Sequence, residues 1–337
     1  MKKILLTGGA GYIGSHIAVQ LYENGYIPVV IDNFSNSQES VIEPLRELTQ
    51  NRLILYKADC NSFNQLSDIF KEHVIEGVIH LAAFKAVGES VEQPLKYYEN
   101  NIQSLVQLLK VMRENKVNNL VFSSSCTVYG TPDKQPVTEE TPWKPAFSPY
   151  GYTKQICENI LKDTHKAHPK LSVVSLRYFN PVGAHPSGLI GELPIGTPNN
   201  LIPYITQVAA GIREHLTVFG NDYDTPDGTC IRDYIHVVDV AEAHVSALDY
   251  LKRKKDSSLE IFNIGTGKGV SVQEIIDIFQ DVNKVPLKVV YGDRRPGDVE
   301  GIYADVTKGE KELNWKAKYD IKDSLKHAWK WQQNLPS

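Results

Sequence analysis

The chain has 337 residues, of which 42% are hydrophobic and 23% are charged, and this composition is close to that of ordinary globular proteins. A wholly disordered chain, a collagen-like chain and a disulfide scaffold are therefore excluded. The net charge of −4 gives the whole molecule no electrostatic reason to bind nucleic acid or an anionic membrane, although a local basic pocket is compatible with it.

The N-terminus and the cysteines predict a cytoplasmic protein. Met1-Lys2-Lys3 precede only three apolar residues before the first glycines, which is too short for a secretion signal. No stretch approaches the ~20 apolar residues of a membrane span. The 4 cysteines are widely spaced and form no C-x-x-C pair, so neither a zinc site nor a disulfide framework is indicated. We expect no metal ion, no nucleic acid and no membrane among the partners.

The first half of the chain alternates short apolar runs with longer amphipathic segments. The apolar runs predict strands at 3–7, 28–31, 53–56, 78–81, 119–123 and 172–176. Helical patterns fill most gaps, notably at 12–24, 93–115 and 150–167. This alternation predicts an α/β fold with a doubly wound, mostly parallel sheet that is covered by helices on both faces.

The pattern of the chain changes after about Arg177. The segment 181–200 is rich in Pro, Gly and Asn and predicts a long ordered loop. Helical patterns follow at 201–213, 237–251, 272–280 and 321–331, separated by short strands. The chain is long enough for two domains, so we expect a first domain at 1–180 and a second, smaller mixed α/β lobe at 181–337. The boundary is approximate, and we expect the lobes to interleave and to enclose a cleft.

A glycine-rich segment joins the first predicted strand to the first predicted helix. Gly9, Gly11 and Gly14 fit G-x-G-x-x-G, and Gly8 opens the related G-x-x-G-x-x-G. Glycines let the backbone approach a pyrophosphate, whose charge meets the positive end of the helix dipole. Asp32 ends the second strand, where it can accept both adenine-ribose hydroxyls and repel a 2′-phosphate, which favours NAD over NADP. The motif alone also fits a glycine turn without a ligand, but this order of elements predicts a Rossmann-type NAD-binding domain.

A second constellation follows the fifth predicted strand. Tyr150 and Lys154 are four residues apart on a predicted helix and therefore face the same side. A free tyrosine has a pKa of ~10, too high for a base at neutral pH. We expect Lys154, together with the positive nicotinamide ring, to lower this pKa by ~3 units, which requires ~4 kcal/mol. Ser125 could hydrogen-bond the same substrate hydroxyl. A Y-x-x-x-K pattern also occurs by chance, but its place after a serine run in a dinucleotide fold indicates catalysis.

These features resemble the extended short-chain dehydrogenase/reductase family, and within it the 4-epimerases of UDP-hexoses. The resemblance spans nearly the whole chain, and the stretches that carry it are 7–16, 85–90, 123–130, 148–154, 176–185, 198–201, 232–236 and 294–298. The first stretch is shared by the superfamily. The stretches that contain Lys85, Asn180 and Arg232 are more specific to the epimerases.

The resemblance implies an NAD-dependent interconversion of UDP-glucose and UDP-galactose. Tyr150 would take the proton of the sugar 4-hydroxyl while C4 gives its hydride to NAD+. The 4-keto sugar would turn over, and hydride and proton would return on the opposite face. The resemblance also implies a homodimer, in which the helices at 93–115 and 150–167 could pair with their copies.

The resemblance assigns residues to each ligand. Those around NAD are Gly8, Gly11, Tyr12, Ile13, Gly14, Asp32, Asn33, Asn36, Ser37, Asp59, Lys85, Asn100, Ser123, Tyr150, Lys154 and Tyr178. Those around the UDP-sugar are Lys85, Ser125, Thr127, Tyr150, Asn180, Asn200, Leu201, Phe219, Arg232, Arg295, Asp298 and Ile302. Arg232 and Arg295 suit a pyrophosphate because a guanidinium binds it bidentately, whereas an arbitrary arginine would more often form a surface salt bridge.

Three alternatives remain at this point. Ile302 matches a position beside the hexose 2-substituent and is intermediate in size, so the N-acetylated UDP-GlcNAc and UDP-GalNAc stay open as substrates, with weak or moderate turnover expected. A nucleotide-sugar 4,6-dehydratase needs an acidic pair beside the Ser/Thr position, where this chain has Cys126 and Val128. A non-catalytic dinucleotide sensor would need neither the Tyr-Lys pair nor the two arginines.

Overall fold

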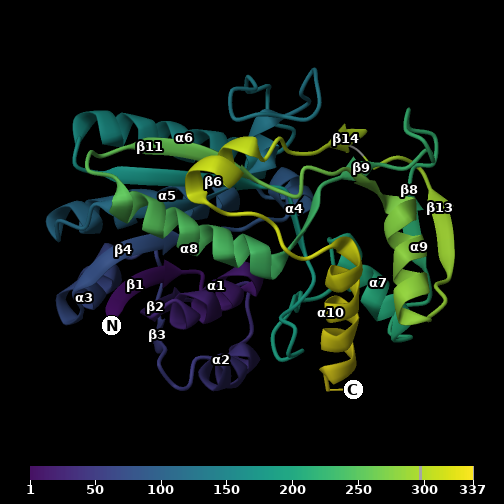
Figure 1. The fold of residues 1–337 in the computed structure, drawn as a ribbon, viewed down its shortest axis with the longest axis horizontal. Helices are drawn as coiled ribbons and strands as arrows, with labels where there is room; N and C mark the ends of the chain where they lie inside the picture. Colours follow the sequence, from purple (N-terminus) through teal and green to yellow (C-terminus); the bar gives the residue numbers. More distant parts are fainter. Residues whose placement is uncertain (296–297, 337) are drawn as a thin grey trace.

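The computed structural model describes residues 1–295 and 298–336, and its largest feature is a sheet of seven strands (Figure 1). The strand order is β11-β6-β5-β4-β1-β2-β3, and all neighbours are parallel. The strands are β1 (Lys2–Thr7), β2 (Tyr26–Asp32), β3 (Ile54–Lys57), β4 (Ile75–His80), β5 (Asn119–Ser125), β6 (Ser172–Tyr178) and β11 (Leu259–Ile264). The predicted Rossmann-type fold is thereby confirmed.

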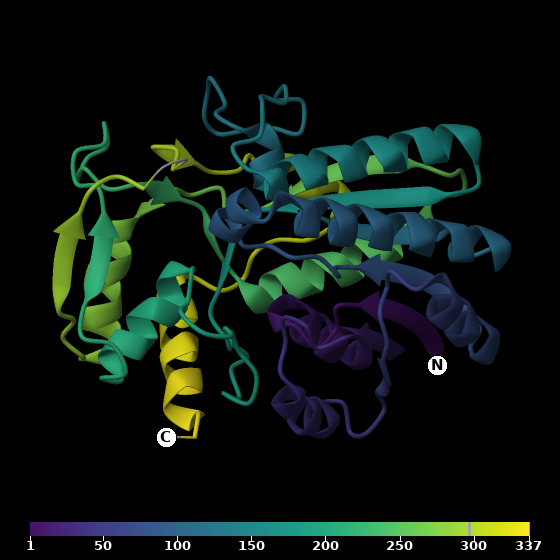
Figure 2. The same cartoon turned by 180° about the vertical axis from the view of Figure 1, so that it is seen from behind.

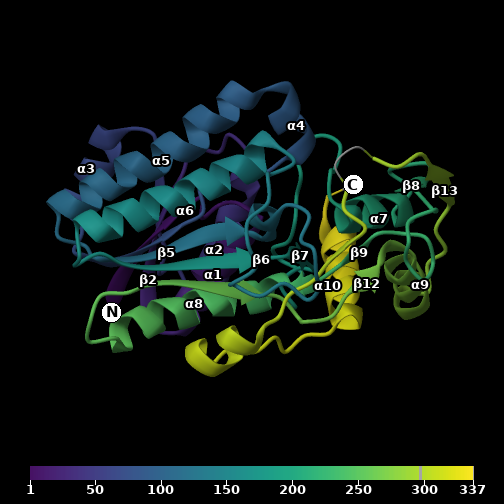
Figure 3. The ribbon, with the colours of Figure 1, turned by 90° about the horizontal axis from the view of Figure 1, so that it is seen from above.

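Helices cover both faces of this sheet, which explains why its inner strands are almost continuously apolar. The core on one face includes residues of α1 (Tyr12–Glu23), α2 (Ile42–Leu48) and α8 (Val237–Arg253). The core on the other face includes residues of α3 (Phe63–Glu72), α5 (Pro94–Glu114) and α6 (Pro149–Ala167). Figure 3 shows α3, α5 and α6 along one side of the sheet and α8 along the other.

Some predicted elements differ from those in the structure. The predicted helix at 93–115 is confirmed as α5, which starts at Pro94, a residue well suited to the first turn, and a short helix that the sequence did not indicate, α4 (Val87–Glu92), precedes it. The predicted helix at 201–213 is shorter, because α7 (Leu201–Ala209) ends before Gly211, which adopts a φ of 73°. The predicted strand at 78–81 lies at 75–80.

The second lobe lies at one end of the main sheet (Figure 2). Its hydrophobic core is formed by α7, α9 (Val272–Asn283) and α10 (Ile321–Asn334) together with the parallel pair β8 (Leu216–Phe219) and β13 (Val289–Gly292). Short elements elsewhere in the described chain are η1 (Glu39–Val41), η2 (Cys126–Tyr129), β7 (Asn180–Val182), β9 (Ile231–Arg232), β10 (Tyr234–His236), β12 (Val270–Ser271), β14 (Gly301–Ile302) and η3 (Gly309–Leu313).

The chain passes between the lobes more than once. After β7 and β10, which pair with each other, the chain returns to the main sheet as α8 and β11 and then enters the second lobe again. The sequence predicted only short strands within the second lobe here, whereas β11 extends the main sheet beside β6. Residues from both halves of the chain therefore surround the space between the lobes.

Within residues 1–295 and 298–336, no helix has the length and apolar character needed to cross a membrane. In the same part of the chain, no group of three or more His, Cys, Asp or Glu side chains is arranged to hold a metal ion.

Candidate active site

A single continuous cavity runs from the glycine loop, past the carboxyl ends of the main strands, into the second lobe. Strand order reverses between β4 and β1, and ligands of doubly wound sheets bind outside the carboxyl ends of the strands at such a point. The cavity volume is about 1750 Å³, which exceeds the ~300–1000 Å³ of a pocket for one ordinary ligand. Every residue that the sequence assigned to NAD or to the UDP-sugar lines this cavity.

The glycine loop forms a cradle in which Gly8 and Gly14 cannot carry a side chain without strain. A Cβ on Gly14 would lie 2.1 Å from the carbonyl oxygen of Gly8, and Gly8 itself adopts a φ of 69°. Helix α1 begins after Gly11 without a side-chain cap and without an acidic residue in its first turn. Its free N–H groups and positive dipole end therefore remain available to an anion. The loop fits the pyrophosphate of a dinucleotide.

Asp32 ends β2 at the rim of this cradle and is held in one orientation. Its Oδ2 accepts a hydrogen bond from the N–H of Ala10 at 2.9 Å, and its Oδ1 accepts from the N–H of Phe34 and the hydroxyl of Ser37, both at 2.9 Å. A carboxylate has about four acceptor positions, so one remains for a ribose hydroxyl. The site therefore fits a dinucleotide with a free 2′-hydroxyl.

Tyr150 and Lys154 lie one turn apart on α6, as predicted. The helix starts where the Ser148 side chain accepts a hydrogen bond from the N–H of Gly151 at 3.2 Å. Lys154 is buried, its Nζ donates to the carbonyl of Ser123 at 2.6 Å, and it lies 6.0 Å from the centre of the Tyr150 ring. β5 and α6 thus fix the ammonium group beside the phenol.

The expected lowering of the Tyr150 pKa does not occur in the chain by itself. Burial raises the pKa of Tyr150 above its ordinary value, the neighbouring Tyr178 raises it further, and a hydrogen bond with Ser125 opposes the rise. Burial also lowers the pKa of Lys154 to about 8. The predicted lowering was for a site that also holds the positive nicotinamide ring, so it stays a prediction, and in the chain alone burial is the largest cause of the Tyr150 shift. Any lowering must come from a cation bound in the cavity.

Arg232 and Arg295 lie in the part of the cavity lined by the second lobe. The Arg232 guanidinium donates to the carbonyls of Ile231 and Val299 at 2.9 and 2.8 Å and lies 3.6 Å from the carboxylate of Asp298. Arg295 donates to the same carboxylate at 3.0 and 3.2 Å. The two arginines therefore share one carboxylate, which leaves net positive charge facing the cavity. Pro296 and Gly297, between Arg295 and Asp298, lie outside the described residues.

Ile302 lines the cavity beside Arg232. It is 5% exposed, lies beside Arg232 in the β9–β14 pair, and packs in one cluster with Cys126 and Phe179. Burial raises the pKa of the Cys126 thiol to about 12, so this cysteine is unsuited to nucleophilic or acid chemistry. The Oγ1 of Thr127 is buried without a hydrogen-bond partner among the described residues.

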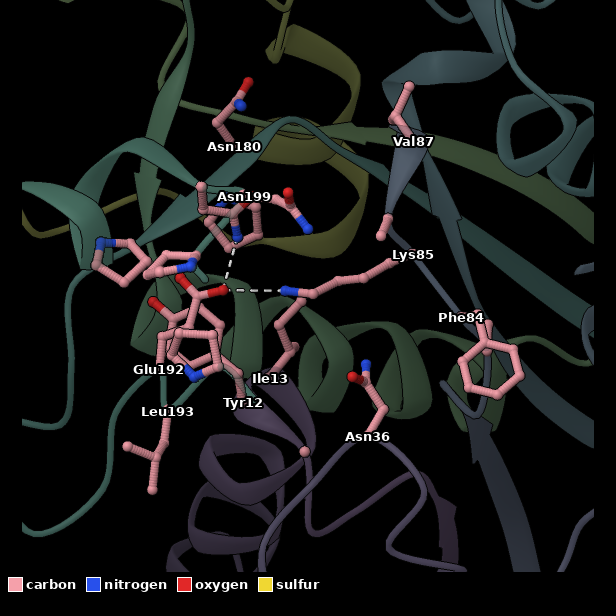
Figure 4. A pocket seen from close by; sticks show the side chains of 18 of the residues that line it. Tyr12, Ile13, Asn36, Phe84, Lys85, Val87, Asn180, Glu192, Leu193 and Asn199 are labelled. Atoms are coloured by element: carbon pink, nitrogen blue, oxygen red, sulfur yellow. Dashed lines mark hydrogen bonds and ion pairs between the residues drawn. The ribbon is translucent and has the colours of Figure 1, made fainter. Parts of the chain in front are cut away.

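Lys85 and Glu192 face each other across the cavity (Figure 4). The Lys85 Nζ donates to Oε1 of Glu192 at 3.1 Å, and the side chain of Asn200 donates to the same oxygen at 2.6 Å. Lys85 also lies 5.8 Å from the ring centre of Tyr12, whose hydroxyl donates to the carbonyl of Gly183 at 2.7 Å. The sequence did not indicate Glu192, because it lies in an irregular loop and is 107 residues from Lys85.

A buried ion pair beneath the site was also missed. Arg177 donates two hydrogen bonds to Glu158, at 2.9 and 2.6 Å, and the Ser124 hydroxyl donates to the same carboxylate. The side chains of Arg177 and Glu158 are 2% and 4% exposed. Glu158 continues the four-residue spacing of Tyr150 and Lys154 along α6. A carboxylate on this buried face of the helix was the pattern in the sequence that could have indicated a buried ion pair. The pair fixes α6 against β5 and β6.

Known proteins are similar to this chain over nearly its whole length. The family model described as GDP-mannose 4,6 dehydratase matches residues 5–328. UDP-glucose 4-epimerase 2 of Arabidopsis thaliana is 51% identical over 99% of this chain and 96% of its own. UDP-glucose 4-epimerase of Bacillus subtilis is 49% identical over 98% of this chain and 97% of its own.

Solved structures agree with the sequence relatives. UDP-glucose 4-epimerase from Bifidobacterium longum, in complex with NAD+ and UDP, is 45% identical, covers 98% of each chain and superposes with a TM-score of 0.95. The UDP-Glc/GlcNAc 4-epimerase from Campylobacter jejuni is 37% identical, covers 99% of this chain and 100% of its own, and has a TM-score of 0.85.

Proposed function

Because this chain belongs to the family of UDP-glucose 4-epimerases, we propose that it interconverts UDP-glucose and UDP-galactose with NAD as its cofactor. The observation that carries this proposal is the single cavity, which is lined by the glycine loop, by the Tyr150–Lys154 pair and by the arginines Arg232 and Arg295. Its volume accommodates a dinucleotide and a sugar nucleotide together.

The reaction needs a base that can take the proton of the sugar 4-hydroxyl once the cofactor and the substrate are bound. Bound NAD supplies the acceptor for the hydride on C4 of the sugar and later returns that hydride. The Tyr150 oxygen takes the proton of the 4-hydroxyl as that hydride leaves and gives the proton back to the 4-oxygen afterwards. Burial keeps Tyr150 protonated in the chain alone, so the phenolate forms only beside an additional positive charge. The strength of Tyr150 as a base therefore depends on whether the bound cofactor is in its positively charged, oxidised form.

Ser125 and Lys154 assist Tyr150 from two sides. The Ser125 side chain lowers the pKa of Tyr150, which favours the ionised form of the phenol, and its hydroxyl can bind the sugar hydroxyl. Lys154 is held by the Ser123 carbonyl and can donate its remaining hydrogens to a ribose hydroxyl or to the phenolate. The second lobe holds the diphosphate of the substrate through Arg232 and Arg295. The hexose, in contrast, has to turn within the cavity between the two half-reactions.

Tyr150→Phe tests this assignment, because it removes the hydroxyl and keeps the ring. We expect kcat to fall by about 10²–10⁴-fold, the usual contribution of a general acid–base, with unchanged NAD content. Tyr152→Phe is the matched control, since Tyr152 lies on the same helix and is 49% exposed. Nearly intact epimerisation of UDP-galactose by the Tyr150 variant would refute the role of Tyr150.

Activity on N-acetylated sugars is a second candidate function, and Ile302 is the observation that bears on it. Its buried, branched side chain lines the cavity, which leaves less room for an N-acetyl group than a smaller residue would. We infer a preference for the simple hexoses with weak or moderate turnover of UDP-GlcNAc. Equal kcat/KM values for UDP-galactose and UDP-GalNAc would contradict this preference.

We further propose that two copies of the chain form a homodimer through α5 and α6. These helices pack side by side, and large apolar residues on and near them are exposed: Val91 by 60%, Leu95 by 78% and Phe147 by 50%. Exposed large apolar residues can mark a protein interface. Light scattering after gel filtration should give twice the mass of 37.8 kDa, and Leu95→Glu should shift it toward one chain. A wild-type mass of one chain would refute the dimer.

A further inference from the structure

Glu192 places a negative charge inside a cavity that is otherwise suited to anions. Its side chain is 13% exposed, and its Oε1 accepts a hydrogen bond from Lys85 (Figure 4) and another from Asn200. The Lys85 Nζ lies 5.8 Å from the ring centre of Tyr12 at the start of α1, where phosphates would bind. The carboxylate therefore competes with a pyrophosphate for the same ammonium group.

The backbone around Glu192 is held firmly, so this arrangement is not that of a free surface side chain. The indole of Trp331 donates to the Glu192 carbonyl at 3.1 Å, and the Asn334 side chain donates to the Gly188 carbonyl at 2.9 Å. A Cβ on Gly191 would lie 2.4 Å from the Trp331 ring, so the loop rests directly on α10. The terminal helix of the second lobe thus sets the position of the carboxylate.

Glu192 also contacts the region assigned to the second ligand. Asn200 precedes α7 and its side chain makes no cap to that helix, so its hydrogen bond to Glu192 is what orients it. Glu192 is also linked to the glycine loop through Lys85, which lies 5.8 Å from the ring centre of Tyr12, and burial and then the Glu192 charge raise the pKa of Tyr12. One side chain is thus linked to both halves of the cavity.

We propose that Glu192 is a positioning residue that weakens NAD binding by neutralising Lys85 and strengthens UDP-sugar binding by orienting Asn200. This inference rests on the proposed function. When a pyrophosphate takes Lys85, the Glu192 carboxylate keeps its hydrogen bond with Asn200. The carboxylate therefore tunes the affinities of the two ligands in opposite directions, and neither effect requires contact of Glu192 with the reacting atoms.

Two substitutions separate the charge from the hydrogen bond. Glu192→Gln removes the charge but can still accept from Asn200, whereas Glu192→Ala removes both. We expect Glu192→Gln to lower the Kd for NADH about five-fold, because a partly exposed charge pair contributes an effect of this order, while the KM for UDP-galactose stays within about two-fold. We expect Glu192→Ala to raise that KM about five-fold, the effect of one lost hydrogen bond.

The measurements are fluorescence titration of the purified full chain with NADH and steady-state kinetics with UDP-galactose. Raising the salt concentration should reduce the difference between wild type and Glu192→Gln in NADH affinity, which a purely structural effect would not do. Glu140→Gln is the control, because it removes the same charge at an exposed position that does not line the cavity.

The failures of the two proposals are distinguishable. A wild-type chain that binds no NADH or does not epimerise UDP-galactose refutes the proposed function and this inference with it. An active wild type, with NADH affinity unchanged or weakened in Glu192→Gln, overturns the inference alone. The inference is likewise overturned if Glu192→Gln and Glu192→Ala change the KM for UDP-galactose equally.

Discussion

Removing the charge of Glu158 should destabilise the whole protein, because Arg177 would remain buried without a counterion. Glu158→Gln keeps the size and shape of the side chain. The two hydrogen bonds of 2.9 and 2.6 Å and the exposures of 2% and 4% show that the pair is almost fully removed from water. Breaking such a pair by removing one partner costs ~3–5 kcal/mol. Arg177 keeps a hydrogen bond of 3.1 Å to the Tyr129 hydroxyl, so we expect the lower end, ~3 kcal/mol.

The assay is urea unfolding at 25 °C, followed by circular dichroism and by tryptophan fluorescence. A loss of ~3 kcal/mol lowers the ratio of folded to unfolded chains about a hundred-fold or somewhat more. Glu43→Gln is the control, because Glu43 pairs with Arg46 at a similar distance of 2.8 Å but at side-chain exposures of 80% and 49%. We expect this exposed pair to contribute less than ~1 kcal/mol. Equal losses in the two variants would refute the reasoning that burial makes the Glu158 pair important.

Three further predictions concern the cofactor loop, the substrate and pH. Gly14→Ala should weaken NADH binding at least about ten-fold, because its Cβ would lie 2.1 Å from the Gly8 carbonyl oxygen and the loop must shift, and an unchanged Kd in fluorescence titration would contradict this. Ile302→Ala should raise the kcat/KM for UDP-GalNAc relative to UDP-galactose about ten-fold, and an unchanged ratio would show that this residue does not limit the substrate. Burial lowers the pKa values of His16 and His244 to about 3 and about 4, so both are neutral when folded. In the unfolded chain both histidines bind a proton below a pKa of ~6.5, so their contribution to the free energy of unfolding is complete above that pH and is lost as the pH decreases. The loss should be about 2 kcal/mol for each histidine at pH 5. A melting temperature that is the same at pH 7.5 and pH 5 would refute this prediction.

Features that depend on neighbouring residues could be predicted from the sequence. The apolar runs predicted strands β1 to β6 of the main sheet, because strands that are covered by helices on both faces are almost continuously apolar. The glycine loop followed by Asp32, and the four-residue spacing of Tyr150 and Lys154, are local patterns whose geometry follows from the strand and the helix that carry them. The resemblance to the epimerases extended these patterns to residues of the second lobe, and all of them line one cavity.

Features that depend on segments far apart required the tertiary structure. β11 joins the main sheet only because the chain returns to the first lobe after residue 180, and its apolar pattern is weak at its partly exposed start. The ion pair of Glu158 with Arg177 and the contact of Lys85 with Glu192 each depend on which segments fold against one another. The direction of the pKa shift of Tyr150 also required the tertiary structure. The spacing placed a lysine beside the phenol, but burial raises the pKa of Tyr150 in the chain alone. The sequence alone thus determined which groups are present at the site, and the tertiary structure decided their burial and pairing, because desolvation and charge interactions depend on the packed surroundings of each group.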